Sequence, residues 1–307
     1  MDVQRGGRAR ACTYPTYGSR TPHDDRLPRG KSPKGLMRIG IILDWMNPNI
    51  ERAVGLLSER GVRLDLIHPE KQLISLSRVR VESDLYLLKS GSDLALSLGG
   101  ALHALGAATL NPYPTVAMMR NKIIVTRVLQ AAGVPTPDTY VTTRPNDLVS
   151  LLESGPLIVK PYRGSRGEGI RIVRHGRELF DLPSDGPILA QRYEEPDGRD
   201  LKIFCIGGKL FGVRRIWPLR TYQDKVGDPF PLTPDLRDIA RSCGRAFGID
   251  LYGLDVVLSS GRPYVVDVNK FGSYMGVPDA SRLLADYIYA AGLRIMRGEQ
   301  LHAAEAT

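Results

Sequence analysis

The feature that most constrains this fold is a hairpin pattern, LYGLDVVLSSGRPYVVDVN, which runs from Leu251 to Asn269. Two apolar, strand-like runs flank a turn around Gly261, a residue type that tight hairpin turns favour. In a hairpin centred on that glycine, Asp255 falls opposite Asp267 on the paired strand. Asp267 and Asn269 then share one face, because side chains alternate along a strand. The hairpin therefore brings two carboxylates and an amide together between apolar flanks.

The opposed carboxylates of this hairpin need positive charge between them, because like charges in register destabilise a sheet. Oxygen ligands select a hard cation, and Mg²⁺ usually takes one or two carboxylates together with nucleotide phosphates. Asp255, Asp267 and Asn269 therefore form a candidate metal site of the kind that also binds a nucleotide. The alternative is three polar side chains on a solvent-exposed face, which the apolar flanks VVL and YVV disfavour.

A second hairpin pattern, LIVKPYRGSRGEGI, combines a buried strand, a lysine and a glycine-rich loop between Leu157 and Ile170. The P-loop requires its lysine after the glycines, whereas Lys160 precedes them. The spacing G-x-x-G-x-G also differs from the dinucleotide fingerprint, and a strand rather than a helix follows. The pattern predicts two strands joined by a flexible lid over a nucleotide, with Lys160 reaching a phosphate. A glycine-rich hairpin without a ligand is the alternative.

The composition is that of an ordinary globular protein, with 42% hydrophobic and 24% charged residues over 307 positions. This length allows two or three packed units. No apolar run approaches the roughly 20 residues that span a bilayer, and the N-terminus has no apolar segment typical of a secretory signal. We therefore expect a cytoplasmic protein without a membrane partner. The cysteines show no paired spacing, which excludes a zinc ribbon or disulfide framework and favours core thiols: Cys12, Cys205 and Cys243.

The formal net charge of +9 is concentrated in residues 1–36, which carry eight basic and three acidic side chains. This segment is rich in Pro, Gly and Arg and cannot bury a core, so we expect a disordered basic tail. Met37 then opens the first strand, MRIGIIL, as a translation start would. The tail lacks interleaved aromatic platforms beyond Tyr14 and Tyr17, which argues against nucleic-acid binding. An RNA-binding arm is the alternative.

Strands and helices alternate after the tail and predict a small open α/β domain with a parallel sheet over residues 37–115. Within it, Ser92 is placed to cap a helix. A compact α+β unit follows over residues 116–193, and it begins with a helix from Val116 to Ala132 that a Gly-Val-Pro stop signal terminates. A short helix from Asn146 to Ser154 precedes the glycine-rich hairpin.

The third unit, residues 194–307, contains the metal-site hairpin and a second pair of long strands. Gly207-Gly208 is the two-residue turn between these other strands. A loop from Pro229 to Pro234 leads into a helix that ends at about Phe247, and a last helix spans Ala280 to Arg297. This order predicts a second α+β unit that carries the candidate metal ligands.

Basic side chains from separate segments supply the positive charge that the carboxylates need. Lys160 ends a buried run and is held before Pro161, so it is a strong candidate for an anion contact. Each of the other cations, taken alone, also fits a solvated surface charge. These other candidates are Lys122, Lys202, Arg214 and Arg215.

The chain from about Met37 to Arg297 resembles the ATP-grasp enzymes, in particular the RimK-type, glutathione synthetase-like ligases. The stretches that carry the resemblance are, in order, NKIIVTRVLQAAGVPTPDTY, LIVKPYRGSRGEGI, ILAQRYEE, GRDLKIFCIGGKLFGVRR and GLDVVL...YVVDVN. The resemblance implies a mixed α/β and α+β fold with a small N-terminal pre-ATP-grasp domain. A central lid subdomain over residues 116–193 and a C-terminal metal-binding subdomain over residues 194–307 would then enclose ATP.

The resemblance also implies roles for individual residues. Lys122 and Lys160 would contact the ATP phosphates. Arg215, together with Arg214, would stabilise the transferring phosphoryl group, and Lys202 would grip the acceptor. Two Mg²⁺ ions, with Mn²⁺ as an alternative, would bind Asp255, Asp267 and Asn269. The lid would comprise Gly164, Ser165, Gly167 and Gly169, and the hinge beside adenine and ribose would comprise Gln191, Arg192, Tyr193 and Glu194.

The resemblance favours an ATP-dependent carboxylate-amine ligase, which forms an acyl phosphate from a small-molecule acid that an amine then attacks. The intact GSRGEG lid supports this interpretation. The alternative is a kinase of a hydroxyl group, such as one of an inositol phosphate or a sugar. The segment DVNKFGSYMGVPDA resembles the ATP-grasp inositol polyphosphate kinases, and Asp267 stands where ligases commonly have Glu. A homo-oligomer would match many relatives.

Two further lysines bear on the acceptor. A small residue tends to follow the metal-binding Asn in the ligases, whereas Lys270 follows it here. This lysine either binds an anionic acceptor or, as the next residue in a strand of period two, points away from the site. Lys89 ends a predicted strand at the edge where open α/β sheets bind ligands, and it fits either a grip for an acidic group or a surface lysine.

Overall fold

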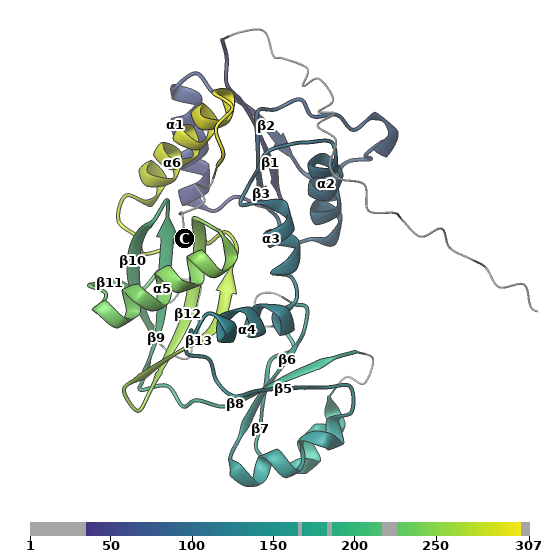
Figure 1. Cartoon of the computed structure of the whole chain (residues 1–307), viewed down its shortest axis with the longest axis vertical. Coiled ribbons are helices and arrows are strands. Elements are labelled where there is room, and N and C mark those ends of the chain that lie inside the picture. The colour runs from purple at the N-terminus through teal and green to yellow at the C-terminus, as the bar shows by residue number, and fades with distance from the viewer. Residues whose placement is uncertain (1–34, 165–167, 183–185, 217–225, 302–307) are drawn as a thin grey trace, which may run out of the picture. The chain divides into compact units, whose positions relative to one another are not determined.

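The computed structural model describes residues 35–164, 168–182, 186–216 and 226–301. The predicted basic tail therefore lies outside the described residues, apart from its last two positions. Ser32–Thr307 form one compact unit, and its described strands make three sheets (Figure 1). Within the described residues, every helix is too short or too polar to cross a membrane.

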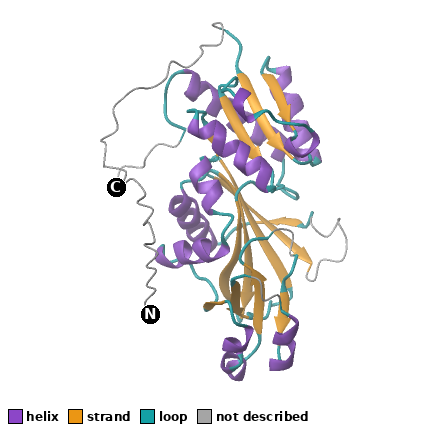
Figure 2. Ribbon diagram, turned by 90° about the vertical axis from the view of Figure 1, so that its right-hand side faces the viewer, coloured by secondary structure: helices purple, strands orange, loops and turns teal. Residues whose placement is uncertain are grey.

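The first sheet is parallel, as the sequence predicts. Its elements are β1 (Arg38–Leu43), α1 (Pro48–Glu59), β2 (Arg63–Ile67), β3 (Leu85–Lys89), α2 (Asp93–Ala104) and β4 (Thr109–Leu110). The strand order is β2-β1-β3-β4. Successive side chains of β1 enter different cores, because Ile41 packs with α1 and Ile42 with α2, so helices cover both faces (Figure 2). Ser92 caps α2 by accepting a hydrogen bond from Ala95 N at 3.1 Å, as predicted.

The helix predicted from Val116 to Ala132 is in fact two helices, α3 (Tyr113–Met118) and α4 (Lys122–Ala131). Asn121 separates them, since its side-chain oxygen accepts hydrogen bonds from Ile123 N at 3.0 Å and Ile124 N at 3.4 Å. An asparagine in this position starts a new helix rather than continuing the old one. The break places Lys122 in the first turn of α4.

The second sheet is antiparallel and contains the glycine-rich hairpin. Its strands are β5 (Thr139–Thr142), β6 (Leu157–Pro161), β7 (Arg171–Val173) and β8 (Ile188–Arg192), in the order β5-β8-β6-β7. Strands β6 and β7 pair directly, so the predicted strand-loop-strand unit is confirmed. The short helix expected from Asn146 to Ser154 is a pair of 3₁₀ turns, Pro145–Leu148 and Ser150–Ser154; a third spans Gly176–Asp181.

The third sheet is antiparallel and carries the metal-site hairpin. Its elements are β9 (Arg199–Ile206), β10 (Lys209–Ile216), β11 (Asp228–Phe230), α5 (Pro234–Phe247), β12 (Leu251–Ser259) and β13 (Arg262–Asn269), with strand order β11-β10-β9-β12-β13. The predicted register is confirmed, since Asp255 pairs with Asp267. Ser260 and Gly261 form the turn with φ of 50° and 74°, a backbone that glycine tolerates best. Part of the loop expected from Pro229 to Pro234 is strand, because β11 pairs with β10.

The two faces of the third sheet differ in character. Helix α5 covers one face, where Leu201, Ile203 and Leu254 pack against it in an apolar core. Cys205 and Cys243 are buried in the same core, as predicted for core thiols. Residues alternate along a strand, so Lys202 on β9 and Asp255 on β12 lie on the opposite face. Polar chemistry is thereby separated from the core of the sheet.

The C-terminal helix, α6 (Ala280–Met296), packs against α1 and completes the core of the first sheet. Asparagines join the third sheet to this assembly. The Asn111 side chain donates to Leu251 O at 2.7 Å and to Lys270 O at 2.5 Å, and Asn49 Nδ2 donates to Tyr274 O at 2.9 Å. These bonds fix the carboxyl end of β13 beside the first sheet.

Candidate functional site

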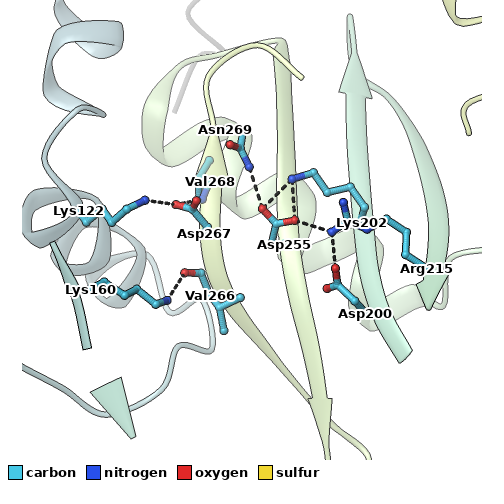
Figure 3. A network of polar contacts seen from close by, with 10 residues as sticks. All are labelled: Lys122, Lys160, Asp200, Lys202, Arg215, Asp255, Val266, Asp267, Val268 and Asn269. Carbon is cyan, nitrogen blue, oxygen red and sulfur yellow. Dashed lines mark hydrogen bonds and ion pairs between the residues drawn. The ribbon is translucent and has the colours of Figure 1, made fainter. Parts of the chain in front are cut away.

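Asp255 is the centre of a polar network on the open face of the third sheet (Figure 3). The register places it between Lys202 on β9 and Asp267 on β13. Lys202 Nζ lies 2.6 Å from each carboxylate oxygen, Arg215 Nη2 lies 3.0 Å from Oδ1, and Asn269 Nδ2 donates to Oδ2 at 2.8 Å. Three side chains from three strands thus converge on one carboxylate.

The environment of this network shifts the pKa values of its two acids in opposite directions. Burial opposes ionisation of Asp255, but Lys202 and Arg215 outweigh it and hold the pKa of this carboxyl below its usual value. Asp200 also pairs with Arg215, yet burial and the neighbouring charge of Asp255 raise the pKa of Asp200 to about 6. Both acids share one guanidinium, and Asp255, which also accepts hydrogen bonds from Lys202 and Asn269, ionises at the lower pH of the two.

Asp267 forms a second centre on the neighbouring strand. Its Oδ1 accepts hydrogen bonds from Lys122 Nζ at 3.0 Å and from Val268 N at 3.0 Å. Lys122 comes from α4, so this ion pair joins that helix to the third sheet. A register shift after Asp255 marks the point where the two carboxylates lie opposite each other.

Lys160 is the most buried cation near these carboxylates, with only 5% of its surface exposed. Its Nζ donates to Gln191 Oε1 at 2.7 Å and to Val266 O at 3.1 Å, two neutral acceptors. Burial lowers the pKa of this lysine to about 8, although the Asp267 carboxylate opposes the shift. Lys160 therefore carries a costly charge that a bound anion would stabilise.

A small cleft separates α4 and the second sheet from β13. Lys122, Lys160, Gln191 and Asp267 line its polar part, and Val125 and Leu129 of α4 are among its apolar lining. The cleft therefore offers cations and a carboxylate next to an apolar wall. Such a combination of a largely apolar wall and a few oriented polar groups is typical of small-molecule sites.

The donor set fits a hard metal ion. Asp255, Asp267 and Asn269 supply only oxygen ligands, because Asn269 uses its nitrogen toward Asp255 and no hydrogen bond within the described residues occupies its Oδ1. Within the described residues, no group of three or more His, Cys, Asp or Glu side chains forms a rival metal site. Two carboxylates and an amide oxygen are suited to Mg²⁺, which completes its shell with water or phosphate.

Several predicted site residues lie away from these two centres. Arg214 is opposite Leu201 in register, so it lies on the α5 face, where its guanidinium is 5.1 Å from the Phe230 ring centroid. Arg192 donates to Leu151 O at 3.0 Å and Gly155 O at 2.8 Å. The structure thus brings Arg215 to the network but directs Arg214 and Arg192 elsewhere.

The remaining lid and hinge residues follow the second sheet. Gly164 is exposed, and Gly169 has a φ of +72° with Pro161 Cγ only 2.7 Å from the position of a Cβ, so glycine is required there. Ser165 and Gly167 lie outside the described residues. Just beyond β8, Tyr193 N donates to Pro156 O at 3.0 Å, and Glu194 is half-buried.

Two charged residues near the site, Asp200 and Arg120, were not predicted from the sequence. Asp200 precedes Lys202 by two residues on β9, and strand periodicity alone places both on one face, so this signal was present. Arg120, in the turn before α4, became recognisable only in the fold. Burial and the nearby charge of Arg120 lower the pKa of Lys270 to about 8.

Comparison with known proteins gives the family. The model of the RimK-like ATP-grasp domain matches residues 119–282, a range that includes the glycine-rich hairpin and the three candidate metal ligands. The chain belongs to the RimK-like ATP-grasp family. The predicted resemblance is therefore confirmed.

Curated relatives are distant and longer than the matched region. A probable alpha-L-glutamate ligase 2 of Shewanella amazonensis is 26% identical over 192 residues, which are 58% of this chain and 64% of the relative. The glutamate--LysW ligase ArgX of Sulfolobus acidocaldarius is 23% identical over 141 residues, 45% of this chain and 50% of the relative. The chain spans between about half and two thirds of the length of such relatives.

Solved structures share the fold. A RimK-domain ATP-grasp protein of Sphaerobacter thermophilus has a TM-score of 0.66 at 19% identity, over 81% of this chain and 98% of the other. An ATP-grasp ligase associated with a ribosomal peptide in Chryseobacterium gregarium, in complex with ADP and a leader and core peptide, has a TM-score of 0.65 at 13% identity, over 83% and 97%. The predicted ATP-grasp fold is therefore confirmed.

Proposed function

We propose that this protein is an ATP- and Mg²⁺-dependent carboxylate-amine ligase that works through an acyl phosphate. One observation carries the proposal. The buried Lys160 and the first-turn Lys122 face Asp267 across one cleft, and Asp267 stands in register with Asp255 beside Asn269. The family membership and the ligase names of the curated relatives support the same reaction.

The nucleotide would occupy the cleft between the second and third sheets. Lys122 and Lys160 bind its phosphates, since a charged phosphate is a stronger acceptor than the neutral Gln191 and Val266 oxygens that Lys160 contacts now. Gly164 and Gly169, in the described part of the glycine-rich loop, would lie next to the phosphates. Adenine and ribose lie along the end of β8 and the residues after it, Gln191, Arg192, Tyr193 and Glu194.

Asp255, Asp267 and Asn269 are the proposed metal ligands. Two bound Mg²⁺ ions supply charge neutralisation at the phosphates. The protein's own part is to present these oxygens already oriented. Lys202, Arg215 and Asn269 hold Asp255 in one geometry, and Lys122 does the same for Asp267, so little reorganisation is required when a nucleotide binds.

The reaction has two balanced steps. A carboxylate oxygen of the acid attacks the γ-phosphorus of ATP, a new P–O bond forms, the bond to the bridging oxygen breaks and ADP leaves. An amine then attacks the acyl carbon, the C–N bond forms, phosphate leaves with the C–O bond electrons, and the surplus amine proton passes to solvent. Arg215 stabilises the charge of the transferring phosphoryl group, and Lys202 orients the acid beside it.

The test is a reaction of the purified protein with Mg-ATP, hydroxylamine and a set of carboxylic acids, followed by phosphorus NMR. Hydroxylamine intercepts acyl phosphates as hydroxamates, so the ligase yields ADP, free phosphate and a hydroxamate from at least one acid. Omission of Mg²⁺ or replacement of Asp267 by Asn should abolish the product. Formation of a hydroxylamine-resistant phosphate ester from an inositol phosphate or a sugar, without free phosphate, would contradict the ligase and establish a kinase.

A further inference from the structure

The two carboxylates proposed as metal ligands are already paired with cations of the protein itself. Lys122 Nζ lies 3.0 Å from Asp267 Oδ1, and Lys202 Nζ lies 2.6 Å from each oxygen of Asp255. Figure 3 shows the two lysines reaching β12 and β13 from opposite sides. A metal ion bound to these carboxylates needs the same oxygen lone pairs, so the lysines and the metal ion compete.

The two ion pairs differ in how easily they open. The Lys122 and Asp267 side chains are 19% and 35% exposed, whereas those of Lys202 and Asp255 are only 10% and 22% exposed. Lys202 is also held in place, because β9 pairs directly with β12 and its Nζ lies 5.9 Å from the ring centroid of Phe204. Opening an exposed ion pair costs much less than opening a buried one. Asp267 is therefore the carboxylate whose cation can be exchanged.

The Lys122 side chain can leave Asp267 without any movement of the backbone. The Lys122 backbone N donates to Tyr162 O at 2.9 Å, and Asn121 caps the same helical turn, so the start of α4 stays fixed. Asp267 also keeps its orientation, because its Oδ1 accepts a second hydrogen bond from Val268 N at 3.0 Å. A rotation of one flexible lysine side chain thus leaves an oriented carboxylate ready for a metal ion.

The cleft beside this pair offers Lys122 an alternative position. Lys122 and the buried Lys160 line the cleft together with Asp267, so its polar end has more positive than negative charge. This charge repels a divalent cation that arrives alone and attracts the anionic complex of a nucleotide with its metal ion. Phosphate oxygens also offer Lys122 a charge-assisted hydrogen bond in place of the one to Asp267.

We propose that Lys122 is an internal counter-ion of Asp267, which it releases to the metal ion only when its ammonium group moves to the nucleotide phosphates. This inference rests on the proposed nucleotide site in the cleft. The exchange makes metal ion and nucleotide bind as one unit, and each raises the affinity for the other by the same factor. Without a nucleotide, a divalent cation must displace Lys122 from Asp267.

Titration of the nucleotide-free full chain with Mn²⁺, with free Mn²⁺ measured by electron paramagnetic resonance, tests the exchange directly. Lys122→Met should bind Mn²⁺ at least about fivefold more tightly than the wild type, because Asp267 loses its competing partner. Lys122→Gln, which keeps a polar side chain, should show the same gain. A purely structural role of Lys122 would not raise the affinity for a metal ion.

Matched variants separate the ion pair from a general effect of charge. Lys160→Met removes an equal charge from the same cleft, but Lys160 contacts the Gln191 and Val266 oxygens instead of a carboxylate. It should therefore raise Mn²⁺ affinity less than about twofold. Lys209→Met, at the exposed turn between β9 and β10, should match the wild type. The proposal is overturned if both Lys122 variants bind Mn²⁺ no more tightly than Lys160→Met.

Calorimetry of ADP with and without Mn²⁺ measures the coupling between nucleotide and metal ion. The ratio of the two ADP affinities should be at least about fivefold smaller in Lys122→Met than in the wild type, because the exchange no longer contributes to it. Mn²⁺ also binds ADP in solution, but equally in both experiments, so the comparison isolates the part of Lys122. Equal ratios in the two proteins would contradict the exchange.

A hydroxamate assay separates this inference from the ligase reaction. If Lys122→Met gains affinity for Mn²⁺ and loses coupling, but the wild type yields no hydroxamate from any acid, the counter-ion role of Lys122 stands and the ligase function fails. If the wild type forms hydroxamates but Lys122→Met gains no affinity for Mn²⁺, the ligase function stands and the counter-ion role fails.

Discussion

The two carboxylates of the site stand in register on adjacent strands but are held in different ways. The Asp255 carboxylate accepts hydrogen bonds from Lys202, Arg215 and Asn269, which all come from its own sheet. The Asp267 carboxylate accepts a hydrogen bond from one side chain, that of Lys122, which comes from a helix outside the sheet. The first centre is therefore complete within one sheet, whereas the second depends on how α4 lies against β13.

The different surroundings of Asp255 and Asp267 suit them to different roles in the site. The Asp255 carboxylate is half-buried and accepts hydrogen bonds from three side chains, which suits a fixed catalytic framework. The Asp267 centre joins helix α4 to strand β13 and borders the cleft lined by Lys160, which suits a place where a ligand enters and is held. We therefore expect substitutions at the two carboxylates to lower turnover to a similar extent but to lower the free energy of unfolding by different amounts.

The largest effect is expected for Asp255→Asn and Asp267→Asn, which should each lower turnover more than about a hundredfold, because each removes a proposed metal ligand. Urea unfolding should then distinguish them. Asp255→Asn leaves the largely buried cations Lys202 and Arg215 without their charged partner and should cost about 3 kcal/mol. Asp267→Asn, at a more exposed pair, should cost less than about 1 kcal/mol.

The matched control for both is Asp238→Asn on the exposed surface of α5, where 76% of the side chain is accessible. It should change neither turnover nor stability appreciably. Equal loss of stability in the two site variants would remove the distinction between a centre within one sheet and a centre between elements.

The next largest loss of activity is expected for Arg215, and the neighbouring Arg214 should lose far less. Arg215→Met removes the guanidinium that contacts Asp255 and should lower kcat about a hundredfold. Arg214→Met affects an exposed side chain on the α5 face and should change kcat less than about twofold. Steady-state kinetics of the pair measures both, and a larger loss in Arg214→Met would refute the assignment of faces.

Nucleotide affinity should respond next. Lys160→Met removes a charged donor from the cleft and should weaken Mg-ADP binding about tenfold, because one charged hydrogen bond contributes about 1.5 kcal/mol. Calorimetry compares this variant with Lys209→Met, which should bind normally. Unchanged affinity in Lys160→Met would mean that the cleft beside Asp267 does not receive the phosphates.

The smallest effect is a pH dependence of stability with opposite signs at the two centres. Between pH 3.8 and about 6 the folded state keeps a proton on Asp200 that the unfolded state has lost, so stability falls as pH rises. Between about 8 and 10.5 the unfolded state keeps a proton that folded Lys160 has lost, so stability rises with pH. Each contribution should be on the order of 1 kcal/mol in denaturant unfolding.

Two variants assign these windows. Asp200→Asn should flatten the acidic one, and Lys160→Met should reduce the alkaline one without abolishing it, because Lys270 titrates in the same range. A profile of Asp200→Asn that still falls between pH 4 and 6 would show that another group carries the acidic dependence.

Local patterns in the sequence predicted much of this fold. The turn at Gly261 determines the register that sets Asp255 against Asp267, and Ser92 marks the start of α2. The break between α3 and α4 was missed because the apolar spacing continues across it, although Asn121 was a visible capping residue. Secondary structure is thus readable where one residue determines the backbone locally.

Contacts between residues far apart in the chain could not be predicted from the sequence. Nothing local indicates that α6 packs on α1, since this contact depends on how the three sheets are assembled. Arg214 and Arg215 look equivalent in the sequence until the pairing of β10 with β9 shows which of them faces Asp255. The chemistry of the site was therefore predictable in kind but not in detail.

The most direct test of the central claim, a magnesium-nucleotide site between Lys160 and the two carboxylates, is calorimetric titration of ADP with and without Mg²⁺. Wild-type protein should bind ADP tightly only with Mg²⁺, and Asp267→Asn should lose the dependence on the ion while keeping its fold by circular dichroism. Binding of ADP that is the same with and without Mg²⁺ in the wild type, or no binding at all, would contradict the account.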